Sequence, residues 1–339
     1  MGFLNLFAIS SMPVLKVLLV SGLGSYLALD RIDILGEDAR KHLNNIVFFV
    51  FNPALVSSNL AKTITYESMV QMWFMPFNIL ITFIIGSALG WVVIQITRPP
   101  PHLHGLVIGC CAAGNLGNML LIIIPAVCKE RGSPFGDSDV CSEYGMGYAS
   151  LSMAVSFSDK IKQHLDMLLQ LMNLKRLFAP STTGVIAGFV VGLVPQIRKL
   201  LIGETAPVHV IQDTALLLGD GAIPAVTLVM GGNLLRGLKG SEIQKSIILG
   251  IIIVRYVALP LLGIVIVKGA TRFGLVHHNP LYEFVLLLQF ALPPAMNIGT
   301  MSQLFGAGES ECSVIMLWCY ALASITLTLW STLFLWLVA

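Results

Sequence analysis

The stretch GLVIGCCAAGNLGNMLLIIIPAV, residues 105–127, is apolar and long enough to cross a bilayer, yet Asn and Gly residues interrupt its centre. The stretch FVLLLQFALPPAMNIGTMSQLF, residues 284–305, is interrupted in a similar way by two prolines and an Asn. Such residues free backbone N–H and C=O groups at membrane depth, where they are tolerated only inside protein or beside a wet cavity. Paired interruptions in two halves of a chain indicate the substrate site of a membrane carrier.

Composition places the chain among membrane proteins. Only 11% of its 339 residues are charged, against about 25% in soluble globular proteins. A net charge of +2 is too small to favour nucleic acid as a partner. The first apolar run has no small-residue cleavage site, so we expect it to remain as a span rather than be removed as a signal peptide.

Apolar runs near the ~20 residues that a bilayer requires predict an all-α polytopic membrane protein with ten transmembrane helices. A hydrophilic interlude at residues 159–178 carries apolar residues at helical spacing, which is typical of an amphipathic helix on the membrane surface. A flexible linker is the alternative for this segment. The ten predicted spans are residues 12–29, 42–61, 68–97, 103–128, 141–158, 179–197, 208–235, 243–268, 281–305 and 311–338.

Basic residues predict the orientation of these spans. The loops after odd-numbered spans hold eleven Lys and Arg residues, and the loops after even-numbered spans hold seven. Because loops rich in Lys and Arg stay in the cytosol, both termini are expected on the opposite side of the membrane. The interlude is then cytosolic.

The interlude divides the ten spans into two halves, residues 1–158 and residues 179–339. Because five is odd, the second half inserts upside down relative to the first. The order of a proline-containing span, an intact span and an interrupted span occurs in both halves, with Pro53 in span 2 and Pro224 in span 7. This order predicts a five-plus-five inverted repeat with broken spans 4 and 9.

Polar residues at the two interruptions are candidate substrate ligands. Asn115 and Asn118 lie three apart in span 4, and Asn297 follows Pro293 and Pro294 in span 9. If the broken spans cross at mid-membrane, the N-termini of their half-helices converge and present positive dipole ends to a carboxylate. The Asn amides would add neutral donors. The alternative is that these small polar residues only help helices to pack in lipid.

Four further residues belong to the same hypothesis. Gly114 and Gly117 allow the backbone to unwind or to approach a ligand closely, and Pro125 lies near the far end of span 4. These three are candidate helix-break positions. Asn52, which directly precedes a proline in span 2, is a further candidate substrate ligand.

Two charged residues lie deep inside predicted spans, Asp220 in span 7 and Arg255 in span 8. An ionisable group at membrane depth is costly and requires a partner or a wet cavity. Both lie at a similar distance along their helices from the loop that joins them, which makes an Asp220–Arg255 pair geometrically feasible. Such a pair would be either a proton-linked conformational switch or a static contact.

The cysteines and the missing catalytic motifs limit the chemistry. Cys128 and Cys141 flank a polar loop and can form a disulfide if that loop faces an oxidising lumen, whereas the other four lie in apolar runs as small buried residues. No G-x-S-x-G motif occurs, and the His residues lack metal-ligand spacing. We therefore expect neither an enzyme nor a bound metal or cofactor.

The ten-span layout, the Asn-Pro pair in span 2, GNLGN followed by Pro125 in span 4 and PPAMNIG in span 9 resemble the plant PIN-LIKES proteins of the auxin efflux carrier superfamily. The resemblance covers essentially the whole chain. It implies a scaffold of spans 1, 2, 6 and 7 and a moving domain whose two broken helices cross at their prolines. PIN carriers usually have one proline at the span 9 break, so the pair Pro293–Pro294 is a departure.

The resemblance also implies a function. It indicates an endoplasmic reticulum carrier of indole-3-acetic acid, the auxin, with Asn115, Asn118 and Asn297 near the crossover. No Asp or Glu accompanies the broken helices, which argues against sodium coupling. Alternatives are an auxin-binding membrane receptor or scaffold without transport, and a carrier of another amphipathic organic anion. Membrane lipid is the expected surrounding, and a homodimer is left open.

Overall fold

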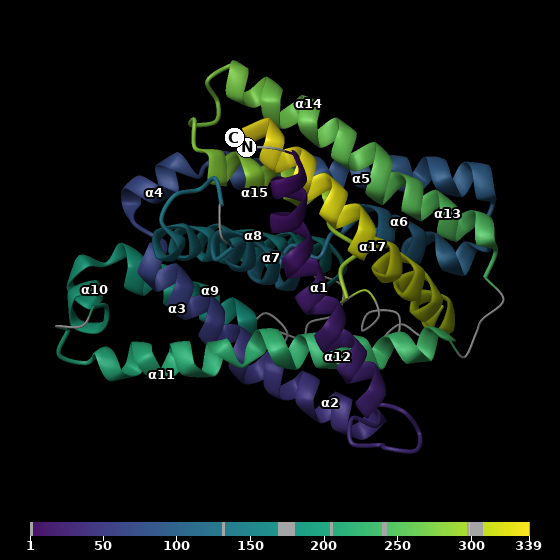
Figure 1. Ribbon diagram of the computed structural model, residues 1–339, viewed down its shortest axis with the longest axis horizontal. Helices are drawn as coiled ribbons and strands as arrows, with labels where there is room; N and C mark the ends of the chain where they lie inside the picture. Colours follow the sequence, from purple (N-terminus) through teal and green to yellow (C-terminus); the bar gives the residue numbers. More distant parts are fainter. Residues whose placement is uncertain are drawn as a thin grey trace.

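Helices make up all the regular secondary structure of the computed structural model, which describes residues 3–130, 133–168, 180–203, 206–238, 243–296, 298 and 308–338. Their arrangement is shown in Figure 1. The helices of the first half are α1 (Phe3–Leu27), α2 (Glu37–Ile46), η1 (Val47–Phe51), α3 (Asn52–Thr63), α4 (Tyr66–Gln71), α5 (Phe74–Thr97), η2 (Pro101–Leu103), α6 (His104–Ala112), α7 (Asn118–Cys128) and α8 (Ser138–Leu168).

The second half continues in the same manner. Its helices are α9 (Pro180–Leu193), α10 (Pro195–Leu201), α11 (His209–Asp220), α12 (Ala222–Leu238), α13 (Lys245–Ile253), η4 (Val254–Ala258), α14 (Leu259–Arg272), α15 (Pro280–Ala291) and α17 (Glu309–Val338). Each predicted span coincides, at least in part, with helix. Helix α8 continues past residue 158 through the first ten residues of the interlude, for which a short amphipathic helix or a flexible linker was expected. Residues 169–178 of the interlude lie outside the described part of the chain.

Two long helices contain a π-helical turn just before a proline. In the first, η1 lies between α2 and α3 and precedes Pro53; in the second, η4 lies between α13 and α14 and precedes Pro260. Proline has no N–H to donate and its ring crowds the preceding turn. A widened π turn accommodates both effects, so each helix continues through its proline instead of ending there.

Helix α15 lies at the centre of one group of helices. All of its residues from Leu281 to Ala291 are buried, and it packs against α5, α8, α14 and α17. The amide of Gln289 crosses this group, because it accepts a hydrogen bond from Asn78 on α5 (2.7 Å) and donates one to Ser152 on α8 (2.8 Å). Polar bonds of this kind fix helices to one another where apolar packing alone is not directional.

A second group of helices packs through glycine. Helix α3 packs on α9, and α1 packs on α12. A Cβ at Gly184 of α9 would lie 2.7 Å from the Pro53 carbonyl oxygen, and a Cβ at Gly231 of α12 would overlap the backbone of Ser21 on α1. Only glycine permits such close approach of helix backbones. In Figure 1 the helices α3, α9, α11 and α12 lie along one edge, and α5, α13 and α14 lie along the opposite edge.

Helix length and apolar composition identify only some of the ten predicted spans. Among the described residues, six helices are long and apolar enough to cross a membrane, and the pair α9–α10, bent by 101° at Pro195, is a seventh candidate. Helices α7 and α15 are apolar but short. They are halves of interrupted segments, so a criterion that requires an unbroken helix does not detect them.

Candidate substrate site at the crossing of two broken helices

The two interrupted segments meet at their breaks. Helix α6 ends at Ala112 and helix α15 ends at Ala291, and the extended residues that follow them form an antiparallel bridge between Gly114 and Pro294. The Asn115 N–H donates to the Pro293 carbonyl, and the Ala295 N–H donates to the Ala113 carbonyl, both at 2.9 Å. Each break therefore satisfies backbone groups that the other exposes, as buried backbone requires.

The residue types at the breaks explain their positions. Pro293 and Pro294 lack N–H donors and stop α15. Space at Gly114 is tight, because a Cβ there would lie 3.3 Å from Nη1 of Arg255. Gly117 is similarly confined, since its Cβ would lie 3.1 Å from Cγ of Met153 on α8. Substitution at either glycine would therefore require the neighbouring side chain to shift by a few tenths of an ångström.

Tyr320 of α17 joins the crossover from a third element. Its hydroxyl accepts a hydrogen bond from Nδ2 of Asn115 and donates to the carbonyl oxygen of Pro294, both at 2.9 Å. Asn115 is buried, with 6% of its surface exposed. Tyr320 is not among the site residues predicted from the sequence. The only available signal was a tyrosine in the middle of an apolar span, where its hydroxyl needs a partner.

Arg255 lies beside the same crossing and is fully buried. Its Nε donates to the carbonyl oxygen of Cys110 at 2.8 Å, while Nη1 and Nη2 have no hydrogen-bond partner. Cys110 belongs to the last turn of α6. A Cβ atom added at Gly114 would lie 3.3 Å from Nη1 of Arg255 and 3.7 Å from the carbonyl oxygen of Gln289 on α15, so the guanidinium is also near the end of α15. The guanidinium thus stands close to the C-terminal ends of both half-helices, where partial negative charge collects.

The predicted ion pair between Asp220 and Arg255 is wrong. Asp220 is the exposed last residue of α11, which packs on α3 and α10, whereas η4 carries Arg255 towards α5 and α15. Both residues lie in the described part of the chain, and no salt bridge joins them. Equal depth from a shared loop does not fix which way each side chain points, and the two segments that carry these residues, α11 and η4, pack on different helices.

Three other predicted site residues are Asn118, Asn297 and Pro125. Asn118 is the first residue of α7, directly after the break, but its side chain and the whole of Asn297 lie outside the described residues. The helix break predicted at Pro125 is wrong, because α7 runs through it to Cys128. A single proline removes one helical hydrogen bond, and the flanking turns of this short helix hold.

Asn52 does not line the apolar pocket between α1, α7, α12 and α17. It begins α3, which packs on α9 and α11, and its Oδ1 is buried without a hydrogen-bond partner. The predicted role of Asn52 as a substrate ligand therefore has no support from its position.

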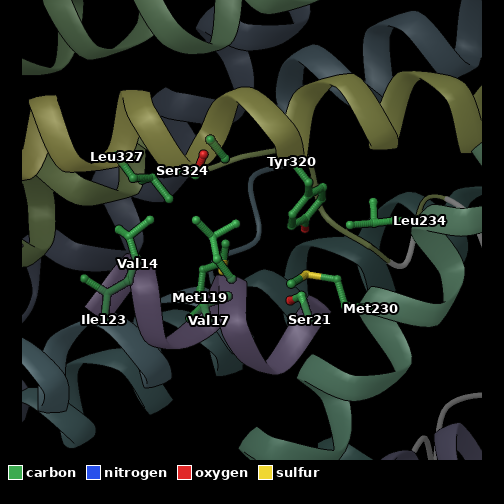
Figure 2. Close-up of a pocket in the computed structure, with 12 residues that line it drawn as sticks. Val14, Val17, Ser21, Met119, Ile123, Met230, Leu234, Tyr320, Ser324 and Leu327 are labelled. Carbon is green, nitrogen blue, oxygen red and sulfur yellow. The ribbon is translucent and has the colours of Figure 1, made fainter. Parts of the chain in front are cut away.

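An apolar pocket adjoins the crossover between α1, α7, α12 and α17 (Figure 2). Its cavity volume is about 40 Å³, well below the roughly 300 Å³ of the smaller small-molecule sites, so a ligand could enter only after the lining side chains move apart. Tyr320 belongs to both the pocket and the crossover. The lining residues are Val14, Val17, Leu18 and Ser21 from α1, Met119 and Ile123 from α7, Met230 and Leu234 from α12, and Tyr320, Ala323, Ser324 and Leu327 from α17.

The cysteines form one disulfide-bonded pair and a group of four free thiols. Cys128 at the end of α7 and Cys141 near the start of α8 form a disulfide, with their Cα atoms 5.6 Å apart. The other four cysteines are buried and reduced. Within the described segments, no group of three or more His, Cys, Asp or Glu side chains is placed to hold a metal ion.

These features define a polytopic helical membrane protein in which two interrupted helices cross beside an apolar pocket. A family model described as "Membrane transport protein" matches residues 9–158 and 156–331. Three proteins of Arabidopsis thaliana are similar along their length. The chain is 55% identical to PIN-LIKES 1, with 100% of this chain and 81% of the relative covered, and 53% identical to PIN-LIKES 3, with 99% of both covered. It is 48% identical to PIN-LIKES 4, with 100% of both covered.

The chain therefore belongs to the membrane transport protein family and, within it, to the PIN-LIKES proteins of the auxin efflux carrier superfamily. Membership in this family indicates a transporter rather than an enzyme.

Proposed function

We propose that this chain is an intracellular carrier of indole-3-acetate that works by alternating access, with the substrate carboxylate bound where the two broken helices cross. The observation that carries the proposal is the backbone bridge between Gly114 and Pro294. Two helices that break in the same place leave two half-helix N-termini near one another, and such ends favour a negative charge. One of them is the start of α7, at Asn118.

The ligands of the carboxylate follow from this placement. Asn115 lies in the break itself, and Asn118 begins the half-helix that follows. An amide nitrogen carries two N–H groups, and the bond to Tyr320 uses one of those on Asn115. Asn297 is proposed as the corresponding group of span 9. The identity of the substrate as auxin comes from the family resemblance, and another amphipathic organic anion is the alternative.

Helix contacts support the ten-span inverted repeat. Span 1 packs on span 7 through α1 and α12, and span 6 packs on span 2 through α9 and α3. Span 10 packs on span 7 through α17 and α12, and span 5 packs on span 2 through α8 and α3. Each pair becomes the other when every span is replaced by its counterpart five spans away. This exchange is expected of two halves related by a two-fold axis in the membrane plane.

The same contacts favour a division into a scaffold and a moving domain. Helices α1, α3, α9, α11 and α12 would form the scaffold, and the group around α15 would move. The pocket has two walls from the first group, α1 and α12, and two from the second, α7 and α17. A ligand held between two bodies that move relative to one another is the arrangement that alternating access needs.

We place the protein in the endoplasmic reticulum membrane with both termini in the lumen. The charge bias of the loops predicts this orientation, and the disulfide supports it independently. Cys128 and Cys141 flank the loop after span 4, which this orientation assigns to the lumen. Disulfides persist in that oxidising compartment and are rare in the cytosol.

Replacing Asn115 with Ala tests the site. We expect the affinity for indole-3-acetate, measured by isothermal titration on purified protein, to fall at least about tenfold, because hydrogen bonds to a charged group contribute about 1.5–3 kcal/mol. The thermal stability should change little. Asn59→Ala is the matched control, since Asn59 is similarly buried but lies on α3.

Tyr320→Phe separates ligand binding from packing. It removes the same Asn115–Tyr320 bond but leaves the Asn115 amide in place. We expect it to retain affinity for indole-3-acetate within a few-fold. If Tyr320→Phe loses affinity as fully as Asn115→Ala, or if Asn115→Ala unfolds the protein, Asn115 is a packing residue and the proposed carboxylate site is wrong.

A further inference from the structure

Among the described residues, three serine hydroxyls are buried without a hydrogen-bond partner, those of Ser21, Ser133 and Ser150, and of these only Ser21, on α1, lines the pocket. Serine hydroxyls within helices usually donate to a carbonyl three or four residues earlier. Ser324 of α17 does so, with its Oγ 2.8 Å from the Ala321 carbonyl. The Oγ of Ser21 is buried and has no hydrogen-bond partner, and only 6% of the residue's surface is exposed. A buried polar group without a partner is costly and calls for an explanation.

Ser21 is also the single unpartnered hydroxyl in the wall of the apolar pocket. Of the twelve lining residues, only Ser21, Tyr320 and Ser324 carry side-chain oxygen atoms. The hydroxyls of Tyr320 and Ser324 are already bonded within the protein. In Figure 2 Ser21 lies on α1 beside Met230, with Tyr320 above them on α17. The rest of the lining is aliphatic or methionine, so the pocket, once its side chains move apart, would suit a flat apolar ring with one polar atom at its edge.

The position of the pocket relative to the crossover sets how a substrate would lie. Met119 and Ile123 line the pocket from the first turns of α7, which begins at Asn118. A carboxylate at the N-terminus of α7 would therefore direct its ring along α7 into the space between α1 and α12. The wall at Ser21 is closed in this conformation. Met119 and Met230 have flexible thioether side chains that can make room for a ring.

We propose that this pocket is the ring subsite of the carrier and that the Oγ of Ser21 accepts a hydrogen bond from the N–H of the indole ring. The inference rests on the proposed function, because it places the carboxylate at the crossover. It adds a residue that distinguishes indole acids from acids of the same shape that lack the N–H. The bound ring supplies the partner that Ser21 lacks in this conformation.

The test compares two ligands on three proteins. Indole-3-acetate and 1-benzofuran-3-acetate have nearly the same shape, but benzofuran has a ring oxygen in place of the N–H. We expect Ser21→Ala to weaken indole-3-acetate binding about threefold to tenfold and to leave benzofuran-3-acetate within twofold of the wild type. Ser324→Ala is the matched control, because its hydroxyl lines the same pocket but is already bonded. It should leave the ratio of the two affinities unchanged.

The melting temperature of Ser21→Ala should equal or exceed that of the wild type, because the change removes an unpartnered buried hydroxyl. If Ser21→Ala leaves the ratio of the two affinities unchanged, or weakens both ligands equally, the ring subsite is wrong while the carrier proposal stands. If the wild-type protein binds neither acid, the proposed function itself fails. The two failures are therefore distinguishable.

Discussion

Arg255 shows how a buried charge in this fold is compensated. A charge at membrane depth requires a partner, and the natural candidate from the sequence was an acidic side chain. The structure instead places its guanidinium beside the carbonyl ends of two half-helices, with a direct bond to Cys110. A helix that ends inside the protein leaves carbonyl groups unpaired and carries partial negative charge there. Two such ends at one crossing explain why an arginine is tolerated without a carboxylate.

Replacing Arg255 with Met should destabilise the protein, because the Cys110 carbonyl at the end of α6 would lose the hydrogen bond that it accepts from the guanidinium. We expect a loss of about 1.5–3 kcal/mol, as for hydrogen bonds to charged groups, seen as a lower apparent melting temperature of purified protein. Arg255→Lys should recover part of the loss. Asp220→Asn is the control, since Asp220 is exposed, and it should have little effect. Equal destabilisation by Asp220→Asn would contradict this account of Arg255.

At the residue scale, a residue's role could be predicted from the sequence when it depends on local backbone chemistry, and could not when it depends on contacts between distant segments. The roles of Gly114, Pro293 and Pro294 in the break could be predicted because chain-breaking chemistry is local. Tyr320 and Ser21 could not be found in this way, since their significance depends on a crossover and a pocket built from distant segments. In the sequence they look like any polar residue in an apolar span.

At the element scale, the interruption in span 4 was predicted where it occurs, between residues 112 and 118. The continuity of the proline-containing helices was less evident, because a π turn can absorb a proline that would otherwise break the helix. Helix α8 runs without a break from span 5 into the interlude. A helix continues as long as its backbone bonds are satisfied, so polar side chains beyond residue 158 do not end α8.

The disulfide between Cys128 and Cys141 covalently joins the end of α7 to the start of α8. Cross-linking residues 13 apart in sequence stabilises a protein by about 3 kcal/mol in the chain-entropy description. We therefore expect reductant to lower the apparent melting temperature of the wild type. It should have no effect on the Cys128→Ser/Cys141→Ser variant. A wild type that alkylates at both cysteines without reduction would show that the bond does not form.

At the scale of the whole molecule, the sequence supports two halves of five spans, because matched interruptions occur in both. It does not reveal which helices pack together. Both lipid-facing and protein-facing surfaces are apolar in a membrane, so hydrophobicity does not separate them. The contacts of α1 with α12 and of α3 with α9 depend on glycines, and the pocket follows from those contacts.

The boundary between the two proposed bodies offers a place to stop the transport cycle. Ser10 of α1 and Thr332 of α17 have their hydroxyl groups in hydrogen-bond contact, and the two helices belong to different bodies. Cysteines at both positions are therefore placed to form a disulfide. Oxidation would fix the moving domain to the scaffold in the conformation described.

The most direct test is uptake of radiolabelled indole-3-acetate into proteoliposomes that contain the Ser10→Cys/Thr332→Cys variant, with and without reductant. We predict saturable uptake by the reduced variant and by the wild type in both conditions, and none by the oxidised variant. The oxidised variant should still bind the acid. Undiminished uptake by verified cross-linked protein would contradict alternating access, and a wild type that binds the acid without any uptake would identify a receptor instead of a carrier.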